Sequence, residues 1–292
     1  MQVIILLTVL VFLHSFQTLF CTLYTSRYGK RGELASPVFC VLQSVVIALF
    51  TWACSGFVTE ASPLTILFGV LNALMLFGFN TSLIKAGALG SYAFMNMMLL
   101  FGGILVPVIY SALFVAGESL GIWQLVAIGL MLLAFVLMNI KDIRLKGTKP
   151  IYYVYCLLLF LSNGFYGTLL KMQSVHCEAQ KDAMVVISYA LMGVIALAQL
   201  GMKEKSGLFN AFRMDRKAVL PLILSLTSSA LAIKVLTEVV SLVDTAVWTT
   251  IDNGGVMILA ASYSFLIFKE KATLNKILAM TLAVGSIVIF SL

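Results

Sequence analysis

Two residues with ionisable side chains, Asp252 and Lys234, lie inside long apolar segments of the sequence. A charged group in a membrane segment costs roughly 2.5 kcal/mol or more, so it must face a partner or a cavity. We expect Lys234 to pair with Asp252, because both lie about 10–15 Å from the same end of their helices at about 1.5 Å per residue. The pair either fixes the helices statically or exchanges partners with a zwitterionic or cationic substrate, or with a proton. We favour exchange, because ionisable groups in such segments usually serve function.

Further polar side chains in the apolar segments could line the same site. These candidates are His14, Gln17, Asn72, Asn96, Asn163, Tyr166, Trp248 and Asn253. His14 and Gln17 share a helix face at spacing i, i+3. Trp248, one turn before Asp252, could present its ring to a cationic or aromatic ligand or anchor the helix at the membrane interface. Each of the other residues could instead hydrogen-bond a neighbouring helix, which is worth about 0.6–2 kcal/mol.

The composition indicates the elements that must position these side chains. Of the 292 residues, 61% are hydrophobic and only 11% are charged, far from the balance of a soluble domain. Each helical crossing of a bilayer needs about 20 apolar residues, so the chain has room for ten crossings and no soluble domain. The sequence therefore predicts an all-α integral membrane protein. Its expected helices cover 2–25, 36–58, 63–84, 91–116, 120–140, 151–173, 182–201, 218–240, 244–268 and 273–291.

The charged residues between these helices predict an orientation. Lys and Arg gather around 27–31, 141–149, 203–217 and 269–271. The positive-inside rule places these loops in the cytoplasm, and with ten crossings both termini then lie on the non-cytoplasmic side. We expect a bacterial inner (cell) membrane. The net charge of +7 serves topology and lipid headgroups and does not indicate nucleic-acid binding.

The sequence also repeats itself. Gly102-Gly103 and Gly254-Gly255 are 152 residues apart, as are Glu118 and Glu270. The repeat predicts a first five-helix unit over 1–145 and a second over 146–292. Since five is odd, the second unit must enter the membrane inverted relative to the first, as in many transporters.

Several residues in these repeats have expected structural roles. Small residues at the Gly-Gly pairs allow helices to pack closely, and they could also bend as access alternates. Pro107 should kink its helix and free a carbonyl group. We expect Glu118 and Glu270 to be structural, each opening the helix that follows it, where a carboxylate offsets the helix dipole.

The repeats resemble the drug/metabolite transporter superfamily, EamA type. The resemblance rests on 90–94 through Pro107, 117–120 with Gly129, Asn163-Gly164 with Lys171, and 244–246 through Gly254-Gly255, then Glu270 and Gly285. The sequence departs from the pattern at 14–17, at Leu259 where a second proline would match Pro107, and at Thr281 where a glycine would match Gly129. The resemblance implies an exporter or exchanger of metabolites working by alternating access between inverted repeats.

The expected cargo is a small polar or zwitterionic metabolite such as an amino acid or amine, because an Asp–Lys pair complements both an ammonium and a carboxylate. Coupling to protons through Asp252 and uncoupled exchange both remain open, and so does a homodimer. One alternative is a flippase for a lipid-linked carrier, which needs a lateral opening between helices. Another is a membrane scaffold or sensor without transport, which predicts a close-packed interior with Asp252 and Lys234 fully paired.

Other functional classes lack their signatures. The sequence has no GxSxG, HExxH or P-loop motif, so we expect neither an enzyme nor a self-contained ATP-driven pump. The five cysteines show no CxxC spacing and the two histidines no ligand-like spacing, so no metal site and no cofactor are expected. The expected partners are membrane lipids and a small-molecule substrate.

Overall fold

The computed structural model describes residues 2–28, 34–57, 60–89, 92–118, 120–139, 149–203, 208–266 and 274–290. These residues form helices and no strand, which confirms the all-helical prediction. The long helices are α1 (Gln2–Arg27), α2 (Ala35–Cys54), α3 (Pro63–Leu89), α4 (Tyr92–Phe114), α5 (Ile122–Asn139), α6 (Pro150–His176), α7 (Lys181–Lys203), α9 (Arg216–Leu242), α10 (Thr245–Leu266) and α11 (Leu274–Phe290). Two short elements, the 3₁₀ turn η2 (Glu178–Gln180) and α8 (Leu208–Ala211), flank α7.

The helix ends follow from local chemistry. Pro63 and Pro150 are the first residues of α3 and α6, where a missing N–H costs nothing. Asp215 caps α9 by accepting a hydrogen bond from the Lys217 backbone N–H at 2.9 Å. The second helix was expected to reach residue 58 but ends at Cys54. Gly56 adopts φ +70°, a left-handed conformation that helps terminate the helix.

The helix surfaces indicate a membrane-embedded protein. Within the described parts of the chain, six helices are long and apolar enough to cross a bilayer, and shorter apolar stretches lie within α4, α5 and α11. Large apolar side chains are exposed on the outside of the bundle, including Ile4 (69%), Leu113 (69%) and Ile122 (74%). Such surface is stable against lipid and unfavourable against water.

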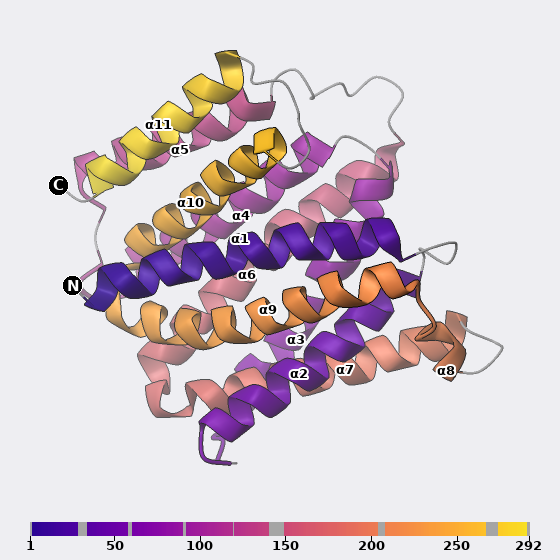
Figure 1. The fold of residues 1–292 in the computed structure, drawn as a ribbon. Coiled ribbons are helices and arrows are strands. Elements are labelled where there is room, and N and C mark those ends of the chain that lie inside the picture. The colour runs from indigo at the N-terminus through magenta and orange to yellow at the C-terminus, as the bar shows by residue number, and fades with distance from the viewer. Residues whose placement is uncertain are drawn as a thin grey trace.

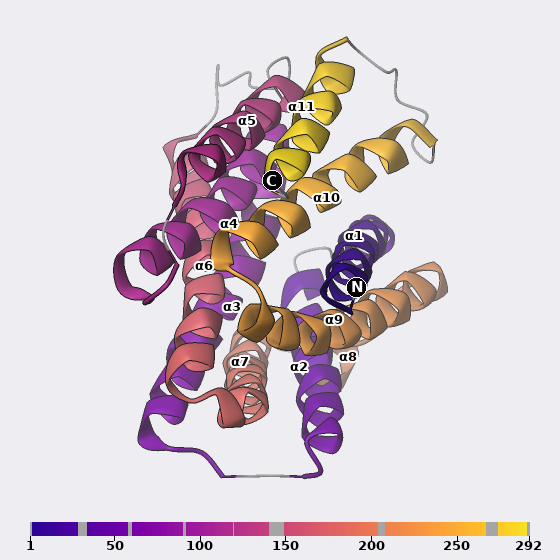
Figure 2. The same ribbon diagram turned by 90° about the vertical axis from the view of Figure 1, so that its left-hand side faces the viewer.

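The helices alternate in direction, so the connections gather at two ends of the bundle (Figure 1). We call one the basic end, which holds Arg27, Lys85, Lys149, Lys203, Arg213, Arg216 and Lys217. The other is the acidic end, which holds Glu60, Glu118, Glu178, Asp182, Glu238 and Asp244. The first and last described residues, Gln2 and Phe290, both lie at the acidic end (Figures 1 and 2). This separation of charge matches the one used to predict orientation.

The two halves of the chain pack against each other reciprocally. α1 packs on α9 and α10, and correspondingly α6 packs on α3 and α4. α2 packs on α7, α5 on α11 and α4 on α10, each pair joining equivalent helices of the two halves. α1 begins at the acidic end and α6 at the basic end (Figure 1). The junction between the expected units 1–145 and 146–292 lies outside the described residues.

The Gly-Gly pairs lie at the closest helix contacts. A Cβ on Gly102 would overlap the Phe160 carbonyl of α6, and one on Gly103 would meet the Asn163 side chain. In the second half, Gly254 faces Met131 of α5, and a Cβ on Gly255 would lie 2.6 Å from Val11 of α1. Both pairs therefore serve close packing, as small residues do in membrane helices. Bending at these positions stays a prediction.

We expect Gly102→Ala to destabilise the protein, because the new methyl group meets backbone that cannot rotate away. Overpacking of this kind costs about 1–3 kcal/mol. Gly129→Ala in α5 is the matched control, since nothing lies within 4 Å of its would-be Cβ. Thermal unfolding in detergent should show a lower Tm for Gly102→Ala and an unchanged or higher Tm for Gly129→Ala. Equal Tm values for the two variants would contradict the packing role.

Candidate functional site

The candidate site is centred on a contact between Asp252 and His14. α10 carries Asp252 two turns into the bundle from the acidic end, and α1 carries His14 near its midpoint. The His14 Nδ1–H donates to the carboxylate, with Nδ1 2.8 Å from Oδ2 and 3.0 Å from Oδ1. The Asp252 side chain is only 9% exposed and that of His14 24%. The hydrogen bond uses Nδ1 of His14, so the second ring nitrogen, Nε2, is the position of the pair at which a further proton would bind.

Two other predicted residues meet at Gly103 of α4. Asn253 and Asn163 both border Gly103, and Asn253 Nδ2 also donates to the Thr249 carbonyl at 2.8 Å. Tyr166 lies one turn along α6 from Asn163 and is partly buried against the core that includes Trp248. The structure therefore gathers candidates from α1, α6 and α10 that are far apart in the sequence.

Trp248 is buried, with its ring edge packed against Gly167 of α6. This position excludes the expected alternative of an anchor at the membrane interface. Among the described residues, nothing accepts a hydrogen bond from its Nε1–H, and the hydroxyl groups of Thr250 and Ser15 also lack partners. A buried polar group without a partner costs about 1–3 kcal/mol. These three groups give the region around Asp252 unused hydrogen-bonding capacity.

The expected partnership of Lys234 with Asp252 is wrong. Lys234 binds Asp182 at the start of α7, with Nζ 2.8 Å from Oδ2 and 2.9 Å from Oδ1. Its Nζ also lies 3.6 Å from Glu238, which in turn binds Lys181 at 2.7 Å. Lys234 lies eight residues before the end of α9 and Asp252 seven residues after the start of α10, but such spacing does not fix the direction in which a helix presents its side chains. Lys234 thus belongs to an ion-pair network at the acidic end.

The remaining predicted residues lie away from the pair or outside the description. Asn72 of α3 is buried and donates to Ser188 of α7 at 3.1 Å, which is a helix-packing bond. The backbone carbonyl of Gln17 accepts a hydrogen bond from Ser225 of α9 at 3.1 Å. The side chain of Asn96 lies outside the described residues. Pro107 lies inside a continuous α4, and its ring faces Gly167.

A second buried ion pair joins Glu118 and Lys171, a pairing that the sequence analysis missed. Lys171 Nζ lies 2.5 Å from Glu118 Oε1, and these side chains are only 8% and 12% exposed. Glu118 Oε2 accepts from the backbone N–H of Thr245, the first residue of α10, at 3.0 Å. Gly117 adopts φ +90° just before Glu118, a conformation that favours glycine. The sequence feature that could have indicated this ion pair is a lysine inside the apolar segment that forms α6.

The expected role of Glu118 is therefore corrected. The prediction placed this carboxylate at the opening of the helix that follows it, α5. It instead binds the first residue of α10, a helix of the other half, because the 115–121 connection brings it beside that terminus. An anion at the positive end of a helix dipole is stabilising, whichever segment supplies it. Glu270, its counterpart, lies outside the described residues.

The acidic end should therefore lose stability as pH falls. Burial alone would raise the pKa of Glu118, but hydrogen bonds from Lys171 and Thr245 outweigh it and hold the pKa below its ordinary value of 4.5. A depressed pKa stabilises the fold fully above that value, and the contribution disappears as pH falls through the folded-state pKa. We expect the Tm difference between wild type and Glu118→Gln to be constant above about pH 5 and to shrink below it. A difference independent of pH down to pH 3 would contradict this assignment.

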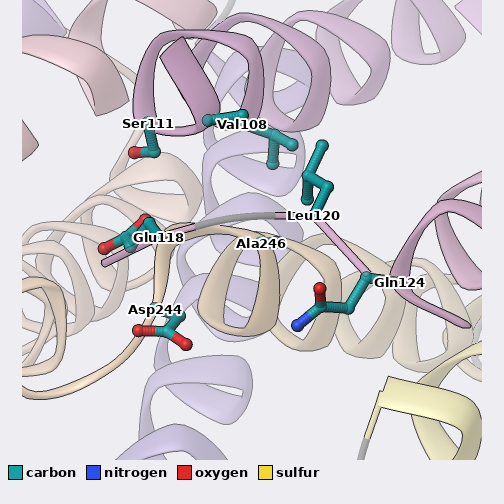
Figure 3. A pocket seen from close by; sticks show the side chains of 8 residues that line it. Val108, Ser111, Glu118, Leu120, Gln124, Asp244 and Ala246 are labelled. Atoms are coloured by element: carbon teal, nitrogen blue, oxygen red, sulfur yellow. The ribbon is translucent and has the colours of Figure 1, made fainter. Parts of the chain in front are cut away.

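Two cavities among the described residues are lined by neither Asp252 nor His14. One, of about 10 Å³, lies beside Glu118, Asp244 and Gln124 (Figure 3). It has room for about one water molecule and none for a metabolite. The other, of about 380 Å³, lies between α1 and α9 at the basic end. Asp252 itself is 6% exposed.

The described residues contain no cluster of three or more His, Cys, Asp or Glu side chains that could hold a metal ion. All five cysteines are free thiols, of which Cys40 and Cys156 are buried. Nothing in this arrangement provides a cradle for a cofactor among the described helices.

Comparison with known proteins establishes the fold alone. No protein-family model matches the chain, and no curated protein matches its sequence. Solved structures do match. One crystal structure of a protein is similar with a TM-score of 0.75 at 16% identity, covering 99% of this chain and 98% of that one. The similarity extends over the full length of both chains, so all helices described here belong to one shared architecture.

Proposed function

We propose that the chain is a secondary transporter of the drug/metabolite (EamA) type, an exporter or exchanger of a small polar or zwitterionic metabolite. An amino acid or amine is the proposed cargo. The observation that carries the proposal is the His14–Asp252 pair, a buried ionisable site between a helix of the first half and a helix of the second. Ionisable groups held within membrane helices commonly mark substrate or proton pathways.

The position of the pair supports alternating access. α1 and α10 pack together across the two halves, so a relative movement of the halves would change the surroundings of Asp252. The reciprocal contact between α6 and α4 is neutral: Asn163 Nδ2 donates to the Leu99 carbonyl at 2.9 Å. Leu100 stands 152 residues before Asp252. The second half therefore has a carboxylate at a position where the first half has an apolar side chain. This difference favours one site of the His14–Asp252 kind per molecule.

The reciprocal packing supports two inverted five-helix repeats and ten crossings. Equivalent helices pair across the halves, and the first helix of each half begins at the opposite end of the bundle. Such inverted repeats are the usual construction of transporters that alternate access around a site near the bilayer midplane. We propose that the basic end faces the cytoplasm of a bacterial cell and that both termini lie outside.

The same contacts support a state that is closed toward the acidic end. Glu118–Lys171, Lys234–Asp182 and Lys181–Glu238 join different helices at this end. A transporter must break contacts on one side to open there, and these ion pairs are the contacts to break.

Flux measurements in proteoliposomes test the proposal. The purified protein is reconstituted, and uptake of a panel of amino acids and amines is followed with and without a pH gradient. We expect accumulation of at least one zwitterionic or cationic metabolite, with stimulation by the pH gradient if His14 and Asp252 couple protons. No flux of any compound would favour the scaffold alternative, and transfer of labelled lipid alone would favour the flippase.

A further inference from the structure

A groove between α1 and α9 at the basic end combines three cations with apolar walls. It has a volume of about 380 Å³. Arg27, Arg216 and Lys217 line it at the helix ends, and Phe20, Leu220 and Leu224 line it further into the bundle. Moving inward along the helices, the lining changes from charged to apolar within two turns. This is the order of polarity met on passing from the headgroup layer into the hydrocarbon of a bilayer.

The three cations have no anionic partner among the described residues. The adjacent carboxylate, Asp215, accepts from the Lys217 backbone N–H and caps α9. Arg216 and Lys217 occupy the first turn of α9, where positive side chains oppose the helix dipole. An anion bound there would gain from both the side chains and the helix terminus.

Pro221 adds a backbone feature to the groove lining. Its ring has no N–H, so the Lys217 carbonyl lacks the donor that normally follows four residues later. A headgroup hydroxyl or ammonium could donate to this carbonyl group. Leu220 is 65% exposed and Leu224 37%, so the apolar part of the groove opens to the surroundings of the bundle.

We infer that this groove binds one anionic phospholipid. The three cations hold its phosphate, and an acyl chain lies along Phe20, Leu220 and Leu224. The orientation of the chain in the membrane is enough to explain basic residues in cytoplasmic loops. It does not require that these residues line a cavity, or that apolar side chains continue the lining of that cavity toward the hydrocarbon. Basic pockets between membrane helices are known to bind lipid headgroups. The inference depends on membrane insertion and not on transport.

Native mass spectrometry of the purified protein tests lipid retention. The probes are phosphatidylglycerol, phosphatidylcholine and inorganic phosphate. The test variant is Arg27→Gln/Arg216→Gln/Lys217→Gln. The control variant, Lys85→Gln/Lys149→Gln/Arg213→Gln, removes three positive charges from the same end outside the groove. We expect the test variant to bind phosphatidylglycerol on the order of 100-fold more weakly, at about fivefold for each cation, and the control to bind it nearly as wild type does.

Other outcomes would overturn the inference. Equal loss in the control variant means diffuse attraction and no site. Equal retention of phosphatidylcholine means that the headgroup charge is not recognised. Competition by inorganic phosphate at lipid-like concentrations means a phosphate-ion site. Leu220→Trp keeps all the charges and fills the exposed apolar wall, so it should also weaken phosphatidylglycerol binding, and unchanged binding would refute the acyl-chain position.

Discussion

Replacing Asp252 with asparagine should reduce metabolite flux to background while the protein remains folded. Asparagine keeps the size of the side chain and a hydrogen-bond acceptor for His14, so the helix contact between α1 and α10 survives. It removes the negative charge that would stabilise a proton on His14. If Asp252 exchanges His14 for an ammonium group or a proton, every transport cycle requires that charge.

Flux in proteoliposomes and the Tm in detergent are measured together. Asp244→Asn is the matched control, because Asp244 immediately precedes α10 and its side chain is exposed. This variant removes the same charge from the same helix region and should transport as wild type does. Full transport by Asp252→Asn at normal stability would show that the His14–Asp252 contact is a static hydrogen bond.

Replacing Glu118 with glutamine should destabilise the protein by about 3–5 kcal/mol, because Lys171 is left as a buried charge without a partner. Both side chains of this pair are nearly enclosed, at 8% and 12% exposure. The residual carbonyl contact of Lys171, with Val240 at 3.3 Å, cannot replace an anion. The double variant Glu118→Gln/Lys171→Met should recover most of the loss, since no unpaired charge remains.

Glu238→Gln provides the comparison for this prediction. The Lys181–Glu238 pair has a similar length, 2.7 Å, but its side chains are 20% and 40% exposed. Exposed pairs contribute about 0–1 kcal/mol, so the Tm should change little. Thermal unfolding of both variants in the same detergent measures the contrast. If Glu118→Gln is no less stable than Glu238→Gln, the enclosed pair does not hold the acidic end together.

The helices themselves could be predicted because every membrane crossing needs the same local sequence pattern. An apolar run of about 20 residues bounded by charge, proline or glycine specifies a membrane helix without any distant information. The observed α3 and α6 begin at Pro63 and Pro150 as expected. The error at the end of α2 has a local cause, since the left-handed Gly56 lies inside a segment that remains apolar.

The partners of the charged residues could not be predicted in the same way. Asp252 was identified from its depth in an apolar segment, and His14 was named separately on another helix. Their contact depends on how α1 and α10 rotate about their axes and pack, which depth along a helix does not fix. The same uncertainty produced the wrong partner for Lys234, because an equally deep lysine can face a different helix.

The sequence alone determined three features: the membrane helices, the separation of charge between the two ends, and the repeat that pairs Gly102 with Gly254. Each of them is a property of composition or of spacing along the chain. Tertiary structure alone decided that Asp252 meets His14 and that Glu118 binds Lys171 and the start of α10. Those contacts join residues more than 50 positions apart. They depend on helix rotation and packing, which many non-local side chains determine together.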